Sequence, residues 1–293
     1  MKAYYIHSHR SLVKRTWLPL HIGVEGEKWC NPFSQLTTTM ELNTVPFWVS
    51  PGKVYVDVEF PLYRTEYFIP IVRRYLYRGC TTLIVQVPII TEKNLQQTFY
   101  SHLEQLDGIA LDYMAVPRVS LTKLSTSMVL FFGRHKIPFI IVEVTDKKQL
   151  LEKEWQWIAQ AQHPSFIPIV PVFSFNDSSS FSYKEWLTLM EEHQVRTLPS
   201  PITEEPLSLE NLKATGIFPT KGEFIYQGDA DYNIYPAYEQ QEQIEGNEQM
   251  FYHKAIPYVT VIRGQVIRAH LELDDYNGYG KYQTISIPNH FTQ

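Results

Sequence analysis

An alternation of short apolar segments with longer helical segments, between residues 54 and 173, constrains the fold more than any other feature of the chain. Five segments have the length and composition of strands: 54–60, 81–87, 110–116, 139–144 and 166–173. The intervening segments carry apolar residues at helical spacing, and 139–144 is almost wholly apolar, as expected for a strand buried on both faces. Strands that alternate with helices predict a parallel sheet with right-handed crossovers.

Both ends of the chain have a different pattern, which predicts β structure. Further strands are expected at 4–13, 18–24, 222–226, 232–235, 258–263 and 265–271. Gly264 lies between the last two, where a hairpin turn is predicted. A helix is expected at 183–192, and the segment 198–206, which holds three prolines, is predicted to be a connector.

Composition limits the classes of protein that this chain can belong to. It has 293 residues, of which 44% are hydrophobic, which suits one large domain or two modest ones. A net charge of −5 argues against nucleic-acid binding. The chain has neither an apolar run of the ~20 residues that a membrane helix needs nor the apolar core of a signal peptide at its start. With Cys30 and Cys80 far apart in sequence, we expect a cytoplasmic protein that does not bind membranes.

Several C-terminal segments resemble a known family in their order and spacing. They are Leu207 to Leu212, Gly216-Ile217-Phe218-Pro219-Thr220-Lys221-Gly222, Gly228-Asp229-Ala230-Asp231, Val261-Ile262-Arg263-Gly264 and Gly278-Tyr279-Gly280-Lys281-Tyr282. Near the other end, Pro51 to Phe60 resembles the strand that opens a barrel and is written Pro-Gly-x-Ile-Asp-x-His-x-His-Phe. The family is that of the cyclic-amide amidohydrolases, the dihydroorotase, dihydropyrimidinase and allantoinase group. The chain resembles a degenerate, shortened member of this superfamily.

The resemblance implies an α/β fold in two parts. Residues 54–215 would form a truncated or incomplete TIM-like (β/α) barrel. Residues 1–53 and 216–293 would form a small composite β-sandwich built from both chain ends. A closed (β/α)8 barrel typically needs ~250 residues, far more than 54–215 provides. The open sheet would expose an edge, so we expect a homo-oligomer or a protein partner.

The resemblance also implies a divalent-metal centre, but its ligands are missing. Asp57 and Glu59 stand where the family has its first two metal-binding histidines, and Glu143 stands at a third histidine position. In one interpretation these carboxylates form an all-oxygen site for a hard cation such as Mg²⁺, Mn²⁺ or Ca²⁺. In the other they are remnants paired with a basic residue, with Arg118 as the candidate. A buried carboxylate needs such a partner, and we favour this second interpretation because the other ligands of the family's metal centre are missing.

Two other features were weighed as binding sites. His7-Ser8-His9 has a ligand-like spacing, but it lies in a terminal β segment, far from the predicted barrel mouth, and is predicted to be a surface pair. Trp157 and Trp186 are expected to pack in the core, and an exposed indole at either position would instead indicate an interface. Nucleophile-elbow, phosphate-loop and Cys-x-x-Cys motifs are absent.

These patterns lead to a hypothesis and two alternatives. The hypothesis is a catalytically degenerate, amidohydrolase-like pseudoenzyme with a binding, scaffolding or regulatory role and no resident cofactor. The first alternative is a metal-dependent hydrolase that cleaves C–N bonds of cyclic amides, with Mn, Zn or Mg in a carboxylate-rich site. The second is a metal-free module that binds a small molecule. Fold alone does not decide among them, because activity belongs to the site.

Overall fold

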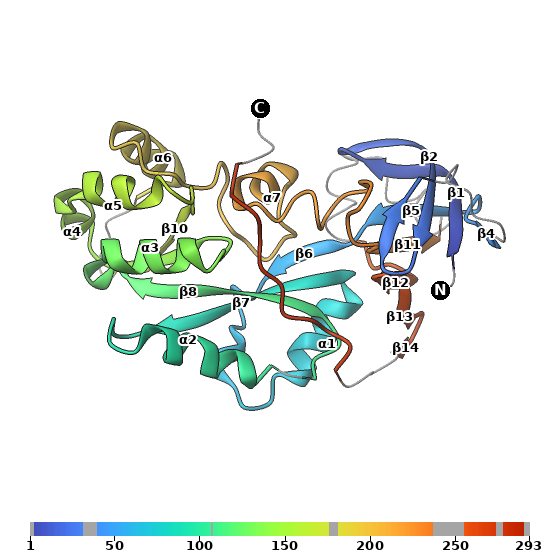
Figure 1. Ribbon diagram of the computed structural model, residues 1–293, viewed down its shortest axis with the longest axis horizontal. Helices are drawn as coiled ribbons and strands as arrows, with labels where there is room; N and C mark the ends of the chain where they lie inside the picture. The colour runs from blue at the N-terminus through green and yellow to red at the C-terminus, as the bar shows by residue number, and fades with distance from the viewer. Residues whose placement is uncertain are drawn as a thin grey trace.

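Two β-sheets lie side by side in the computed structural model, one flanked by helices and one formed by strands from both ends of the chain (Figure 1). The structure describes residues 3–31, 40–106, 108–175, 181–236, 255–273 and 278–289. Over these residues, no helix has the length and apolar character needed to cross a bilayer.

The first sheet is parallel, and its strands follow one another in chain order. It consists of β6 (Lys53–Val56), β7 (Cys80–Ile89), β8 (Asp112–Ser120), β9 (Ile140–Val144) and β10 (Ile169–Phe173). Neighbouring strands pair in parallel throughout, and the sheet curls into a half-barrel. Most side chains of these strands are buried, because apolar residues cover both faces. The five strands predicted from the βα alternation are all present.

Seven α-helices and two short 3-10 helices are assigned in the described residues. They are η1 (Leu62–Arg64), α1 (Ile69–Tyr77), α2 (Leu95–Glu104), η2 (Leu121–Lys123), α3 (Thr126–Arg134), α4 (Lys147–Glu152), α5 (Trp155–Gln162), α6 (Tyr183–Glu192) and α7 (Leu209–Thr215). Side chains of Ser125, Asp146, Ser182 and Ser208 cap α3, α4, α6 and α7 by accepting backbone N–H bonds. After β9, the extended backbone at Lys153 separates α4 from α5.

The gap between the two edge strands of the half-barrel is bridged by residues 196–207, which contain the proline-rich connector 198–206. At one end, the backbone N–H of Ile169 in β10 donates to the carbonyl of Arg196 over 2.9 Å. At the other, the N–H of Leu207 donates to the carbonyl of Val54 in β6 over 2.8 Å. Leu198 and Leu207 are buried in the core. The connector therefore supplies part of the wall that further strands would supply in a complete barrel.

The second sheet has nine strands and joins the two ends of the chain. Its strands are β1 (Ala3–Val13), β2 (Thr16–Glu25), β3 (Lys28–Cys30), β4 (Met40–Asn43), β5 (Phe47–Pro51), β11 (Tyr232–Pro236), β12 (Val259–Ile262), β13 (Gln265–Ala269) and β14 (Glu272–Leu273). The junction is the antiparallel pairing of β5 with β11. The strand expected at 222–226 is instead a turn-rich loop. The sandwich form of this part stays a prediction.

Two glycine-containing segments fix how these parts meet. In the turn between β12 and β13, Arg263 and Gly264 both have positive φ, 46° and 74°, which suits a two-residue hairpin. The C-terminal segment 278–289 crosses the half-barrel along the amino ends of its strands (Figure 1, red). Any side chain at Gly280 would collide with the carbonyl oxygen of Leu111, so glycine is required at this crossing.

Candidate functional site

Asp57, the first residue after β6, begins a row of polar side chains at the carboxyl ends of the parallel strands. Its side chain is fully buried. Oδ2 accepts the backbone N–H of Leu62 over 2.8 Å, and Oδ1 accepts the backbone N–H of Gln86 over 2.9 Å. Burial raises the pKa of Asp57 to about 8, although these hydrogen bonds oppose the shift. The carboxyl group is therefore mostly neutral at pH 7.

Gln86, Arg118 and Glu143 continue the row across the next three strands. The Gln86 side-chain amide donates to the Asp57 backbone carbonyl over 2.6 Å, and its Oε1 accepts from Arg118 Nη1 over 2.8 Å. Arg118 Nε then donates to Glu143 Oε1 over 2.5 Å. We call Asp57, Gln86, Arg118 and Glu143 the carboxyl-end ladder. The Arg118 guanidinium is its only cation, and 10% of that side chain is exposed.

Glu59 does not join the ladder. Strand β6 ends at Val56, so the strand alternation that would place Asp57 and Glu59 on one side does not continue through them. The Glu59 side chain is 52% exposed and lies 3.5 Å from Arg74 in α1. Its backbone N–H donates to Glu204 of the connector over 2.6 Å. Of the three predicted ligand positions, the structure thus connects Asp57 with Glu143 through Gln86 and Arg118, and leaves Glu59 outside.

The residues present do not fit the divalent-metal centre that the family resemblance implies. Both oxygens of Asp57 already accept hydrogen bonds from backbone N–H groups, and burial raises the pKa of this carboxyl group, which disfavours the deprotonated form that a metal ligand needs. Glu143 is committed to Arg118, whose positive charge would repel a cation. Among the described residues, no group of three or more His, Cys, Asp or Glu side chains is placed to hold one ion.

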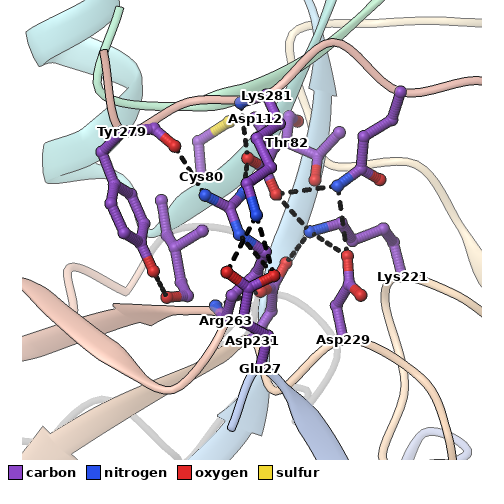
Figure 2. Close-up of polar contacts among 12 residues, drawn as sticks. Glu27, Cys80, Thr82, Asp112, Lys221, Asp229, Asp231, Arg263, Tyr279 and Lys281 are labelled. Carbon is purple, nitrogen blue, oxygen red and sulfur yellow. Dashed lines mark hydrogen bonds and ion pairs between the residues drawn. The ribbon is translucent and has the colours of Figure 1, made fainter.

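A second polar group lies at the opposite, amino ends of the same strands (Figure 2). Lys221, with no exposed side-chain surface, contacts three carboxylates: its Nζ is 2.6 Å from Asp112 Oδ2 and 2.7 Å from both Asp229 Oδ2 and Asp231 Oδ2. Asp112 is the first residue of β8 and also pairs with Arg263 in the β12–β13 turn. We call these five residues the amino-end cluster.

The amino-end cluster joins the two sheets and the C-terminal segment. Lys28 of β3 pairs with Asp229 at 2.5 Å, and the backbone N–H of Lys281 in the C-terminal segment donates to Asp112 over 2.9 Å. Burial alone would raise the pKa of Asp229, but the ammonium groups of Lys221 and Lys28 hold that pKa below its usual value. The positive and negative groups are thus matched at close range, as buried charges require.

Neither Gln86 nor the chemistry of the amino-end cluster was predicted from the sequence. Gln86 carried a usable signal, since it is the only long polar side chain within the predicted strand 81–87. Lys221, Asp229, Asp231 and Arg263 lay inside the motifs that carried the family resemblance, whereas Asp112 lay outside them, and nothing in the spacing showed that Asp112 and Lys221 would meet. His7 and His9 stack on β1 with ring centroids 5.3 Å apart, outside the ladder. Trp186 is buried, whereas Trp157 is 53% exposed.

Comparison with known proteins shows what fold holds these two groups. No protein-family model matches the sequence, and no curated protein sequence matches it. Solved structures do match. A D-hydantoinase aligns with a TM-score of 0.63 at 12% identity, over 98% of this chain and 99% of that chain. The dihydropyrimidinase from Brevibacillus agri aligns with a TM-score of 0.57 at 11% identity, over 97% and 99% of the two chains.

A third match is the L-hydantoinase (dihydropyrimidinase) from Arthrobacter aurescens, with a TM-score of 0.58 at 12% identity, over 96% of this chain and 100% of that chain. At such low identities the likeness establishes the fold alone, which this chain shares with these hydantoinases and dihydropyrimidinases. The predicted resemblance is therefore confirmed at the level of the fold. The chemistry of this chain has to be argued from its own residues.

Proposed function

We propose that this chain is a pseudoenzyme on the amidohydrolase fold, which binds or scaffolds a partner rather than hydrolysing a cyclic amide. One observation carries the proposal: the Arg118 guanidinium links Glu143 to Gln86, and Gln86 links to Asp57. The positive charge of Arg118 thus neutralises the Glu143 carboxylate at the carboxyl ends of the strands. A metal-activated water, the nucleophile of metal-dependent hydrolysis, has no ligand set here.

The burial of Asp57 and Gln86 in the ladder supports the same proposal. Asp57 is fully buried, and Gln86 is 2% exposed. Asp57, Arg118 and Glu143 line none of three cavities of about 610, 640 and 1000 Å³, and Gln86 lines only the smallest. A substrate would have to reach a carboxyl group enclosed by η1 and β7. The ladder thus supports a structural role for these four side chains.

The experiment that tests this proposal measures metal and turnover on the same sample. Natively purified protein is analysed by elemental mass spectrometry without a chelator, then incubated with Mn²⁺, Zn²⁺ or Mg²⁺ and assayed with a hydantoin and a dihydropyrimidine. We expect no stoichiometric metal and no hydrolysis. One or two metal equivalents per chain that disappear in Asp57→Ala, together with turnover, would establish the hydrolase alternative and refute the pseudoenzyme.

A binding role requires a partner, and we propose a second copy of the chain as the first to test. The exposed sheet edge that would favour an oligomer is partly covered, because residues 196–207 form hydrogen bonds to β10 and β6. Exposed apolar side chains do gather near the β12–β14 end of the other sheet, at Ile256, Tyr258, Val266 and Leu271. Light scattering on a concentration series would show a dimer or larger species if this is right, and a monomer throughout if it is wrong.

The division of the chain into residues 54–215 and the two flanking parts, 1–53 and 216–293, likewise stays a proposal.

A further inference from the structure

A cavity of about 640 Å³ lies beyond the Glu143 end of the ladder and shares none of its residues. Its walls come from η2, which follows β8 directly, and from α4 and α5, which follow β9. It therefore opens at the carboxyl ends of two neighbouring parallel strands, where α/β folds commonly bind ligands. Its volume falls within the usual range for a small-molecule site.

The cavity has an apolar floor and one exposed aromatic wall. Leu121, Leu124 and Ile158 are buried beneath it. Trp157 lines it with an indole that is 53% exposed, although the equally large Trp155 and Trp186 nearby are completely buried. Leaving a tryptophan half in water forgoes much of the stabilisation that its burial would give. The exposed indole thus offers a flat apolar surface to a ligand.

Hydrogen-bonding groups of both kinds surround this indole. Thr122, Thr126 and Gln149 can each donate and accept, and the carboxylates of Glu152 and Glu154 accept. Lys153 is partly buried, and its Nζ donates to the carbonyls of Leu121 and Leu124 over 3.2 and 2.7 Å. An ammonium has three donors, so one N–H of Lys153 remains beyond these two bonds.

The balance of these groups selects the chemical class of the ligand. Two carboxylates disfavour an anion, and the Lys153 ammonium lies among them, so a compact cation gains little. A pyranose has an apolar face that stacks on an indole and a rim of hydroxyls that donate and accept at once. We propose that this cavity binds a neutral carbohydrate of one or two sugar rings, with Trp157 as the stacking platform. The proposal goes beyond the pseudoenzyme assignment and does not depend on it.

The test uses the full chain with maltose and cellobiose as probes. Saturation-transfer NMR and calorimetry detect binding without relying on indole fluorescence, so the loss of Trp157 does not remove the readout. We expect saturable binding of at least one disaccharide, weakened about tenfold in Trp157→Ala, which corresponds to about 1.4 kcal/mol. Trp157→Phe, which keeps an aromatic face, should retain a larger share of the affinity than Trp157→Ala.

The matched control is Trp17→Phe. Trp17 packs against Trp48 in the nine-stranded sheet, with ring centroids 5.2 Å apart and far from the cavity, so this change should leave sugar binding intact. Because Trp157 is exposed, its substitution should not unfold the protein, and circular dichroism checks this. Three results would overturn the proposal: no saturable binding of either disaccharide to the wild-type chain, equal binding to Trp157→Ala, or saturable binding of spermidine in place of the sugars. None of these results bears on metal content or hydrolysis.

Discussion

The amino and carboxyl ends of the parallel strands carry two polar groups that differ in kind. At the amino ends, Lys221 is enclosed by three aspartates and has no exposed side-chain surface. At the carboxyl ends, Arg118 and Glu143 pair in partial contact with solvent, with side-chain exposures of 10% and 37%. The first group joins segments from distant parts of the chain, and the second links neighbouring strands.

This difference separates what holds the fold from what would perform chemistry. Four of the five residues of the amino-end cluster, all but Asp112, lie in the motifs that resemble the amidohydrolases, and the cluster fixes the two sheets and the C-terminal segment to one another. The carboxyl ends are where a barrel of this type has its reactive groups. There the chain carries the carboxyl-end ladder, whose four residues form hydrogen bonds with one another. The fold is thus retained by residues that differ from those that would determine activity.

The largest effect should follow from removing the cation of the amino-end cluster. Lys221→Met leaves three aspartates facing one another without the ammonium that they share, and breaking a buried ionic group in this way typically costs about 3–5 kcal/mol. We expect a loss of that size in the free energy of unfolding, measured by urea denaturation. Lys123→Met, at an exposed position in η2, is the matched control and should change it by less than about 0.5 kcal/mol.

A loss below about 1 kcal/mol for Lys221→Met would contradict the assigned role of the cluster, because it would mean that the aspartates find other partners or take up protons easily. The companion change Asp112→Asn tests the same point from the carboxylate side. Asp112 contacts both Lys221 and Arg263, so its neutralisation should destabilise the protein as well.

The second prediction concerns the pH dependence of stability that Asp57 introduces. Its pKa is about 8 in the folded chain and near 3.8 in an unfolded one, so the folded state binds the extra proton between these values. The free energy of unfolding should therefore fall as pH rises through this interval. We expect a decline of about 2–3 kcal/mol from this group, less than the full shift implies, since buried sites relax and admit water.

Asp57→Asn removes the titrating group, so the decline should be smaller in the variant. The variant will start from a lower stability, because an amide cannot accept all the hydrogen bonds that the carboxyl group accepts. The two proteins are therefore compared by the slope of the free energy of unfolding against pH. Urea denaturation at intervals between pH 5 and pH 8 would give both slopes. Parallel slopes for the two proteins would show that Asp57 is ionised in the folded state, which would restore one argument for a metal ligand.

The sequence predicted the half-barrel well, because each strand and helix is defined by the local pattern of apolar residues. The segment 139–144, almost wholly apolar, is strand β9 at Ile140–Val144 in the middle of the parallel sheet. Interruptions were harder to predict. At the break between α4 and α5, the Lys153 side chain donates to the carbonyls of Leu121 in η2 and Leu124 just after it, and both are distant in sequence.

The candidate site was predicted less completely, because its geometry depends on where strands end. Glu143 and Arg118 lie on strands of predictable register, and their contact follows from neighbouring positions in the sheet. Asp57 and Glu59 were both placed at metal-ligand positions by the family resemblance, yet β6 stops at Val56 and the chain turns before Glu59. No local pattern fixes that endpoint. The bridge between β10 and β6 could not be predicted either, since its hydrogen bonds join residues far apart in the sequence.

The smallest of the three effects should follow from breaking the carboxyl-end ladder at its cation. Arg118→Met removes the bonds to Glu143 and Gln86 together. Because Glu143 is more than one-third exposed, water can replace much of what it loses, so we expect only about 1–2 kcal/mol. Glu59→Ala is the matched control, since its 3.5 Å contact with Arg74 is exposed and should contribute less than about 0.5 kcal/mol.

A double-mutant cycle sharpens the contrast between the two ends of the sheet. If the ladder acts as one unit, Glu143→Gln should lower the free energy of unfolding less in the Arg118→Met background than in the wild-type chain, because Glu143 has already lost its partner. Strictly additive losses in the free energy of unfolding would mean that Arg118 and Glu143 do not interact. The Arg118 guanidinium would then not neutralise the Glu143 carboxylate. The pseudoenzyme proposal would lose its main support, whereas the role of the amino-end cluster in holding the fold would be unaffected.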